Sequence, residues 1–221
     1  MAASISRSIQ QENEVDSNQV SLKEAFLTNE RYRRASWISN LLMVSVWLNG
    51  FQAILNWANQ ILDDILDEDA YITPREGVYI IGFSQFIASV ISLWAVTKLD
   101  RKTLLLFGHL GSAVLLFTLG VCLTTNNKQY ILWVVSAYAF VFNVSNATVI
   151  NVYIVEICTD IALGASLVTM QVVILLETST ALYLIQWLKP SGFFFLYSAL
   201  SAGGFLFVAF YIGETKGLTD K

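Results

Sequence analysis

The sequence predicts an all-α membrane protein, a polytopic bundle of six transmembrane helices preceded by a short surface helix. Of its 221 residues, 55% are hydrophobic and 14% are charged, and the mean hydropathy is +0.57. Apolar runs of about 20 residues recur along the chain, which is the length that an α-helix needs to cross the hydrocarbon core of a bilayer. This composition excludes a soluble domain and makes the lipid bilayer the first partner of the chain.

The apolar runs divide the chain into three regions. A polar N-terminal tail with a surface helix covers residues 1–35, the six-span bundle covers 36–212, and a short C-terminal tail covers 213–221. Residues 1–20 are mostly polar and cannot bury a core of their own. The predicted spans are residues 36–62, 77–96, 103–125, 129–155, 161–187 and 192–212.

A short amphipathic helix is predicted over residues 21–34, at the membrane surface before the first span. Ser21 and Glu24 have the spacing of a capping box, in which each side chain bonds the backbone amide of the other residue. The first eleven residues are rich in serine and free of acids, and they faintly resemble a mitochondrial targeting segment. On this basis we expect the mitochondrial inner membrane.

The distribution of basic residues predicts the orientation of the bundle. Ten of the 13 Lys and Arg residues lie in the two tails or in the 98–102 loop, and the opposite side holds only Arg75, Lys128 and Lys189. Basic residues favour the cytoplasmic side, so both termini are expected on the cytoplasmic or matrix side. The acidic loop at 63–76 then lies on the other side.

The first predicted span carries a line of polar residues. Ser45, Asn49, Gln52, Asn56 and Asn59 follow one another at steps of four, three, four and three, so they share one face of a continuous α-helix. Unpaired amides are costly in hydrocarbon, so this polar seam must face protein, a bound lipid or a water-filled cavity. Asn49, Gln52 and Asn56 are the candidate substrate-binding residues, and we expect them to face the second, fourth or fifth span or a partner.

Two carboxylates and one histidine are further candidates inside the bundle. Glu177 lies near the middle of the fifth span, where an ionisable residue is either functional or a hydrogen-bonded structural group. Glu156 ends the polar fourth span. His109 is the only histidine, and we expect it to be hydrogen-bonded in the packing rather than to relay protons.

Several motifs in register resemble the C-terminal half of sugar porters of the major facilitator superfamily. ETKGL at 214–218 is similar to the terminal PETKG motif, and DRKTLLLFGHLGS at 100–112 resembles the GRR loop and the helix that follows it. YIVEI with GASL at 164–167 resembles the stretch around the family's acidic motif, and LNGFQAILNW at 48–57 resembles the signature of the seventh helix. The resemblance implies six helices equivalent to helices seven to twelve, in a family whose two halves rock about a central site.

The resemblance also implies that the sugar site has eroded. Val46 and Trp47 stand where the family has paired glutamines that bind sugar hydroxyls, and Gln52 stands at the following asparagine. Gln85 matches the asparagine of the eighth helix, which adds it to the candidate substrate-binding residues. The seam phase places Trp47 about 160° from Asn49, so we expect Trp47 to point outward.

Two more departures concern the helices that bend during transport. Asn56 and Trp57 replace a pair of tyrosines, and the orientation of Trp57 stays open. The Gly/Pro-rich segment of the tenth helix matches residues 145–151, which contain neither glycine nor proline. An unbroken helix is stiffer, so we expect this span to lack a hinge.

Two functions follow from these observations. The first is a non-transporting accessory or structural subunit of a larger membrane complex, which uses the polar seam to hold other membrane subunits or a lipid. The alternative is a sugar-type solute transporter that acts with a second six-helix half or as a homodimer. No catalytic residues, metal ligands, cofactors or nucleic-acid partners are expected, and no enzymatic activity, because Glu177 and His109 have no assigned reaction partners.

Overall fold

The computed structural model describes residues 21–58, 62–63 and 73–213, and every regular element in this part of the chain is a helix. Five helices are long and apolar enough to cross a membrane: Tyr32–Asn56, Pro74–Lys98, Arg101–Thr124, Ile131–Ile157 and Asp160–Tyr211. The last of these is two helices, because Lys189 has the non-helical angles φ 60° and ψ 163° and Pro190 follows it. The predicted all-α bundle of six spans is therefore confirmed.

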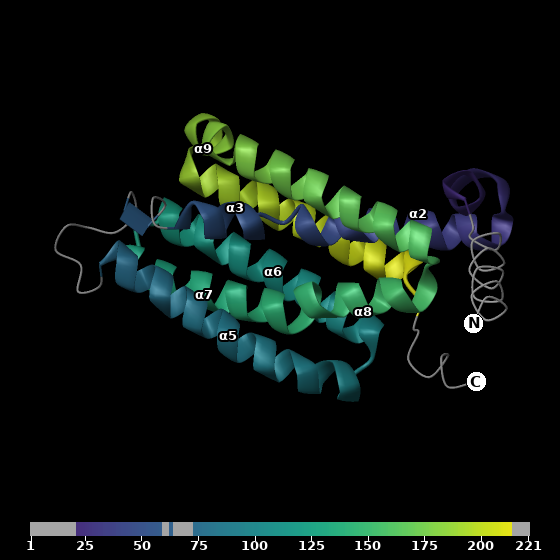
Figure 1. Ribbon diagram of the computed structural model, residues 1–221. Helices are drawn as coiled ribbons and strands as arrows, with labels where there is room; N and C mark the ends of the chain where they lie inside the picture. The colour runs from purple at the N-terminus through teal and green to yellow at the C-terminus, as the bar shows by residue number, and fades with distance from the viewer. Residues whose placement is uncertain (1–20, 59–61, 64–72, 214–221) are drawn as a thin grey trace, which may run out of the picture.

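The spans run back and forth along a single bundle (Figure 1). α9 (Asp160–Tyr211) packs against α6 (Arg101–Thr124) and α2 (Glu30–Trp47), while α5 (Pro74–Lys98) packs against α7 (Ile131–Phe142). The start of α2, the turn between α5 and α6, and the end of α9 lie at the same end of the bundle in Figure 1. An even number of spans produces this arrangement.

A capping box opens the first described helix, as the sequence predicts. The Ser21 amide donates to Glu24 Oε2 at 2.9 Å, and the Glu24 amide donates to Ser21 Oγ at 3.3 Å. The helix is shorter than expected, because η1 (Glu24–Thr28) is a single π-helical segment and α2 already begins at Glu30. The arginines at the end of the predicted surface helix therefore belong to the first turns of α2.

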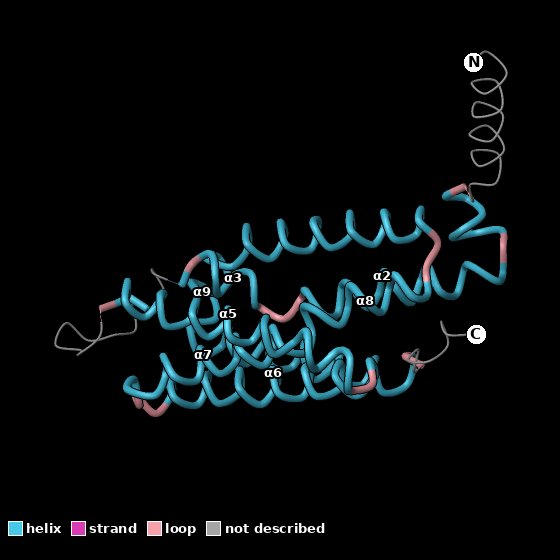
Figure 2. Tube along the Cα trace, turned by 60° about the horizontal axis from the view of Figure 1, so that its bottom comes forward, coloured by secondary structure: helices cyan, strands magenta, loops and turns pink. Residues whose placement is uncertain are grey.

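The first span is not one continuous helix. α2 ends at Trp47, and α3 (Phe51–Asn56) begins after Gly50, whose φ of 87° lies in the left-handed region. A left-handed residue turns the backbone out of α-helical phase, and glycine adopts this conformation without a Cβ clash. The prediction of one polar seam along a single helix is therefore wrong, because positions before and after Gly50 do not share a face. Figure 2 draws the interruption as a loop segment between α2 and α3.

The second span begins with another capping box. The side chain of Thr73 accepts from the Glu76 amide, and the Thr73 amide donates to Glu76 Oε2 at 2.9 Å. Pro74 occupies the first turn, where its missing N–H leaves no hydrogen bond unmade. Most of the predicted acidic loop falls on residues 64–72, outside the described residues, as do Asn59 and the 214–218 motif.

The fourth span stays helical throughout, but its winding changes at a point that lacks proline and glycine. A π-helical segment, η3 (Asn143–Ala147), separates α7 from α8 (Thr148–Ile157). Side chains support the wider turn: Asn143 Nδ2 donates to the Ala139 carbonyl at 2.9 Å, and Thr148 Oγ1 bonds the Asn143 carbonyl at 3.1 Å. The span is nevertheless one continuous helix from Ile131 to Ile157, so the expectation of an unbroken fourth span is confirmed, and the π-helical turn is a local change of winding supported by polar side chains.

The outer faces of the bundle are apolar, as contact with lipid requires. On α5, Phe83, Phe86 and Leu93 are between 66% and 70% exposed. The interior is filled by large apolar side chains such as Phe142 and Phe193, both fully buried. Both features suit a protein whose outer faces contact the hydrocarbon of a bilayer and whose interior is packed with protein side chains.

Candidate solute site at the break in the first span

Asn49 is the centre of the break between α2 and α3. Its side chain is fully buried, and its Oδ1 accepts from the Phe51 amide at 3.1 Å, as a turn-forming asparagine does. The hydroxyl of Tyr138, on α7, donates to the Asn49 carbonyl and Oδ1 at 3.0 Å and 3.2 Å. Asn49 therefore faces the fourth span and not lipid, which agrees with the prediction, and it ties the break to α7.

Glu177, on α9, packs against the break and binds its backbone. Its side chain is 1% exposed, and its Oε1 accepts from the Gly50 amide at 2.5 Å. Gly50 immediately precedes α3, where backbone N–H groups have no acceptor within the helix and the helix dipole favours an acidic oxygen. The intramembrane position of Glu177 is visible in the sequence, but its contact with the first span needs the fold, because 127 residues separate it from Gly50.

Gln52 and Asn56 form an accessible amide strip with Thr178 of α9. Asn56 is exposed, and its Nδ2 donates to Thr178 Oγ1 at 3.2 Å. Gln52 Nε2 donates to Asn56 Oδ1 at 3.4 Å, and Trp57 Nε1 donates to the Thr178 carbonyl at 3.3 Å. Asn56 thus faces the fifth span as predicted, and Trp57 is turned toward the same helix. We call Gln52, Asn56 and Thr178 the amide strip.

Gln85 does not join the amide strip. It lies half-buried on α5, which packs chiefly against α7, η3 and α8, whereas α3 packs against α9. No hydrogen bond links its side-chain amide to another residue in the part of the chain that the structure describes. The structure therefore brings Asn56 and Gln52 together but leaves Gln85 on another element.

Val46 and Trp47 face the interior of the bundle. Val46 is fully buried, and the Trp47 ring meets Phe142 of α7 edge to face, with ring centroids 5.9 Å apart. The outward orientation expected for Trp47 is wrong, because α2 ends at this residue and the helical phase used to place it does not continue. Neither position offers a side-chain group that binds a solute at the surface.

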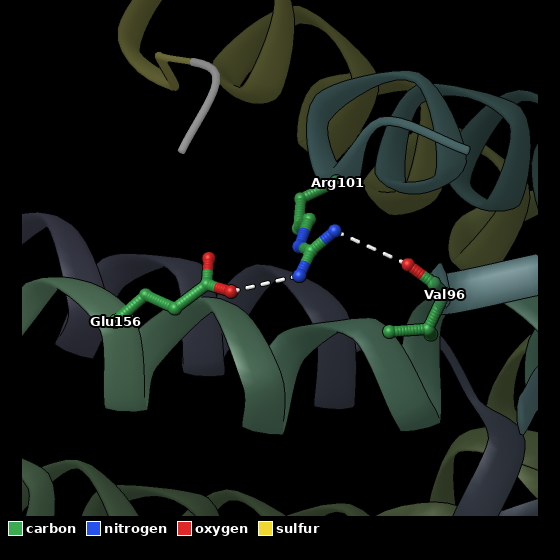
Figure 3. Close-up of polar contacts among 3 residues, drawn as sticks. All are labelled: Val96, Arg101 and Glu156. Carbon is green, nitrogen blue, oxygen red and sulfur yellow. Dashed lines mark hydrogen bonds and ion pairs between the residues drawn. The ribbon is translucent and has the colours of Figure 1, made fainter. Parts of the chain in front are cut away.

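Glu156 lies in an ion pair at the end of the bundle where α5 and α6 meet. Its Oε1 is 2.9 Å from Arg101 Nη2, and Arg101 Nη1 donates to the Val96 carbonyl at 3.1 Å (Figure 3). Each charged side chain is 15% exposed, so the pair is largely shielded from water. Arg101 was visible in the DRK motif, but its pairing with Glu156 needed the fold, because 55 residues separate them.

A second polar group was not anticipated from the sequence. Ser39 Oγ and Ser166 Oγ lie 3.0 Å apart between α2 and α9, and Thr169 Oγ1 bonds Asn40 Oδ1 at 2.6 Å. Hydrogen bonds between helices are a common means of association within membranes. These four residues fasten the start of the first span to the fifth span.

A bundle of six apolar helices with lipid-compatible outer faces defines the class of polytopic membrane proteins. The chain belongs to the family described as "Sugar (and other) transporter", which matches residues 1–220. The sequence resemblance to sugar porters is thereby confirmed, and the protein is an integral membrane protein.

Three relatives give the scale of the similarity. Hexose transporter 1 of Plasmodium knowlesi and of Plasmodium falciparum are each 27% identical over 223 aligned positions, covering 96% of this chain and 43% of theirs. A Bacillus subtilis (strain 168) protein named "Putative metabolite transport protein YwtG" is 30% identical over 146 residues, covering 62% of this chain and 32% of its own length. This chain therefore spans less than half the length of these relatives, all of which are named as transporters.

Proposed function

We propose that this chain is one six-helix half of a sugar-porter-type transporter and forms one wall of its solute path. The observation that carries the proposal is the amide strip of Gln52, Asn56 and Thr178, which lies on an accessible face beside the break that Glu177 closes. Amide and hydroxyl groups supply both donors and acceptors, which a polyhydroxylated solute requires.

The irregular backbone in two spans supports transport rather than a purely structural role. Alternating access needs helices that bend near the solute, and irregular backbone at membrane depth is tolerated only where protein or a cavity satisfies it. Gly50 and η3 give the first and fourth spans such points. A second six-helix half would then complete the solute path opposite this one.

The solute that we propose is a hexose or a similar small polyol. Two of the relatives are named as hexose transporters. Val46 and Trp47 supply no polar group at the surface. Gln52 and Asn56 would therefore form the hydrogen bonds to the solute. Gln85 of the second span would add a further contact if the two halves close around the solute.

Counterflow of radiolabelled glucose into liposomes that contain the protein complex purified from its native membrane tests the proposal. Asn56→Ala removes one donor to a hydroxyl and is expected to raise KM roughly 2- to 10-fold, the factor that one lost hydrogen bond of about 0.5–1.5 kcal/mol gives. Asn127→Ala is the matched control, because Asn127 is exposed in the turn after α6. Glucose counterflow that is absent, or equal in both variants, contradicts a hexose site at Asn56.

A non-transporting accessory subunit is the second candidate, and the inward packing of Val46 and Trp47 favours it. Val46 and Trp47 stand where the family has paired glutamines in its sugar site. In this chain the two side chains pack into the core instead. In this case the amide strip would bind another membrane subunit or a lipid headgroup. The mitochondrial inner membrane, with both termini on the matrix side, is the location that we propose for such a complex.

Co-purification separates the two candidates. An accessory subunit should remain in a larger complex through extraction in mild detergent, and the other subunits should be identified by mass spectrometry. A chain that migrates alone, or with a single companion of the same family, contradicts the accessory role.

A further inference from the structure

Four fully buried side chains between α6, η3 and α9 carry polar atoms that have no hydrogen-bond partner among the described residues. The atoms are His109 Nδ1 and Nε2, Ser112 Oγ, Asn146 Nδ2 and Oδ1, and Ser201 Oγ. Each of the four side chains is 0% exposed. We call these four residues the His109 cluster.

Contacts between the helices place the cluster in one region. Ser198 Oγ donates to the Ala113 carbonyl at 2.7 Å, and a Cβ at Gly204 would lie 2.7 Å from the ring of His109. These two contacts fix the register of α9 on α6 and bracket Ser201, one turn before Gly204, and Ser112, one turn after His109.

Asn146, on η3, lies against the same stretch of α6. A Cβ at Gly108 would overlap the Asn146 carboxamide and the Ser145 hydroxyl, so the absence of a side chain at Gly108 leaves room for them. Gly108 precedes His109 directly. Two glycines thus accommodate the polar side chains of the cluster.

The serines of the cluster differ from other buried serines of the bundle. Ser136 Oγ donates to the Leu132 carbonyl at 2.8 Å, and Ser166 Oγ donates to the Ala162 carbonyl at 2.8 Å, so both are satisfied within their own helix. Ser112 and Ser201 make no such bond in the described structure. Their hydroxyls are free to bind a ligand held between the helices.

We propose that ordered water molecules occupy the His109 cluster and bridge α6, η3 and α9. Buried polar groups are almost always hydrogen-bonded, and six unpaired atoms in one region would be strongly destabilising. The cluster needs a ligand that both donates and accepts, because a neutral imidazole, a carboxamide and two hydroxyls present both kinds of group. Water does this with two to four partners, whereas a bare ion satisfies only acceptors or only donors.

X-ray radiolytic labelling of the intact chain in nanodiscs tests the proposal, with the bound water itself as the probe. Hydroxyl radicals made from a bound water modify the side chains next to it, so His109 should be labelled although it is fully buried. Phe194 is the reference, because it is 1% exposed and packs edge-on against Phe193. His109 labelling no greater than that of Phe194 would overturn the proposal.

Substitutions in the cluster give an independent test, because the expected change in melting temperature has opposite signs for a hydrated and a dry cluster. In a dry cluster, Ser201→Ala and Asn146→Leu remove unpaired groups and should leave the melting temperature unchanged or raise it. In a hydrated cluster they should lower it and reduce His109 labelling, because about 1.4 kcal/mol of lost hydrogen bonding lowers the binding constant of the water roughly tenfold.

Ser136→Ala is the matched control, since its hydroxyl is bonded within α7, and it should leave His109 labelling unchanged. Raised melting temperatures in both cluster variants, with unaltered His109 labelling, would also overturn the proposal. Wild-type labelling decides the question alone if a variant fails to fold.

Discussion

Replacing Gly50 with alanine is expected to destabilise the bundle through two separate effects of one methyl group. The left-handed backbone at φ 87° disfavours any L side chain by roughly 1–2 kcal/mol. The new Cβ would also lie 2.9 Å from Cγ of Tyr197. Tyr197 is 2% exposed and packs against Phe193 with ring centroids 4.7 Å apart, so it has little room to move.

The magnitude follows from adding the two effects. Overpacking a tight core is typically destabilising by about 1–3 kcal/mol, so the total is about 2–5 kcal/mol. For a chain of this size, each kcal/mol shifts the melting temperature by roughly 2–4 °C. A loss near the middle of the range, about 3 kcal/mol, therefore lowers the melting temperature by roughly 6–12 °C. Fluorescence-detected melting in detergent micelles measures this shift.

Gly82→Ala is the matched control. Gly82 lies within helix α5, and nothing would lie within 4 Å of its Cβ. Alanine favours a helix by about 0.5–1 kcal/mol relative to glycine, so this variant should melt at or slightly above the wild-type temperature. The two substitutions are chemically identical and have opposite expected signs.

The variant Tyr197→Ala separates the two effects. In the double variant Gly50→Ala/Tyr197→Ala the steric overlap is gone and only the left-handed backbone remains. The two changes in unfolding free energy should therefore be non-additive by about 1–3 kcal/mol. A Gly50→Ala protein that melts like the wild type would refute the left-handed break. In that case the first span would be continuous and the polar seam would be restored as one helical face.

Other substitutions test the remaining features. Arg101→Ala should lower stability by about 1.5–3 kcal/mol in the same melting assay, because it removes a charge-assisted hydrogen bond from a site that is largely shielded from water, and Arg101→Lys should recover part of the loss. An unchanged melting temperature in Arg101→Ala would contradict this role. Leu99→Cys and Asn126→Cys should react with an impermeant maleimide from opposite faces of sealed vesicles, and labelling from one face would refute the topology. Gly108→Ala should cost about 1–3 kcal/mol through overlap with η3, whereas equal or higher stability would show that η3 moves freely.

The six spans could be predicted from the sequence because membrane insertion depends on length and apolar content alone. The capping boxes at Ser21 and Thr73 are also local signals, since the two partners lie three residues apart. The break at Gly50 had a local signal too, the Asn-Gly pair at 49–50, which is typical of turns. Treating the whole apolar run as one helix hid that signal and misplaced Trp47.

The candidate site could be predicted only in part. Asn49, Asn56 and Glu177 were found from the cost of polar groups in hydrocarbon, which needs no knowledge of the fold. The hydrogen-bond partners of Asn49 and Asn56 could not be predicted. Tyr138 and Thr178 lie on other spans, and the bundle contains many other tyrosines and threonines. The π-helical η3 was missed because its causes are polar side chains that bond their own helix, and no glycine or proline marks the place.

The break at Gly50 and the π-helical η3 both depart from regular α-helix inside the bundle. Loss of glycine and proline does not by itself leave regular helices, because the backbone at Gly50 and the π-helical turn each have their own support. A buried acid on α9 satisfies the backbone at Gly50, and side chains of Asn143 and Thr148 support η3. Backbone that leaves α-helical geometry inside a membrane must be satisfied by protein or water, so its retention in two spans implies specific interactions at both places. The apolar packing at Val46 and the irregular backbone at Gly50 and η3 are therefore separate features, and the first does not by itself imply a stiff, purely structural bundle.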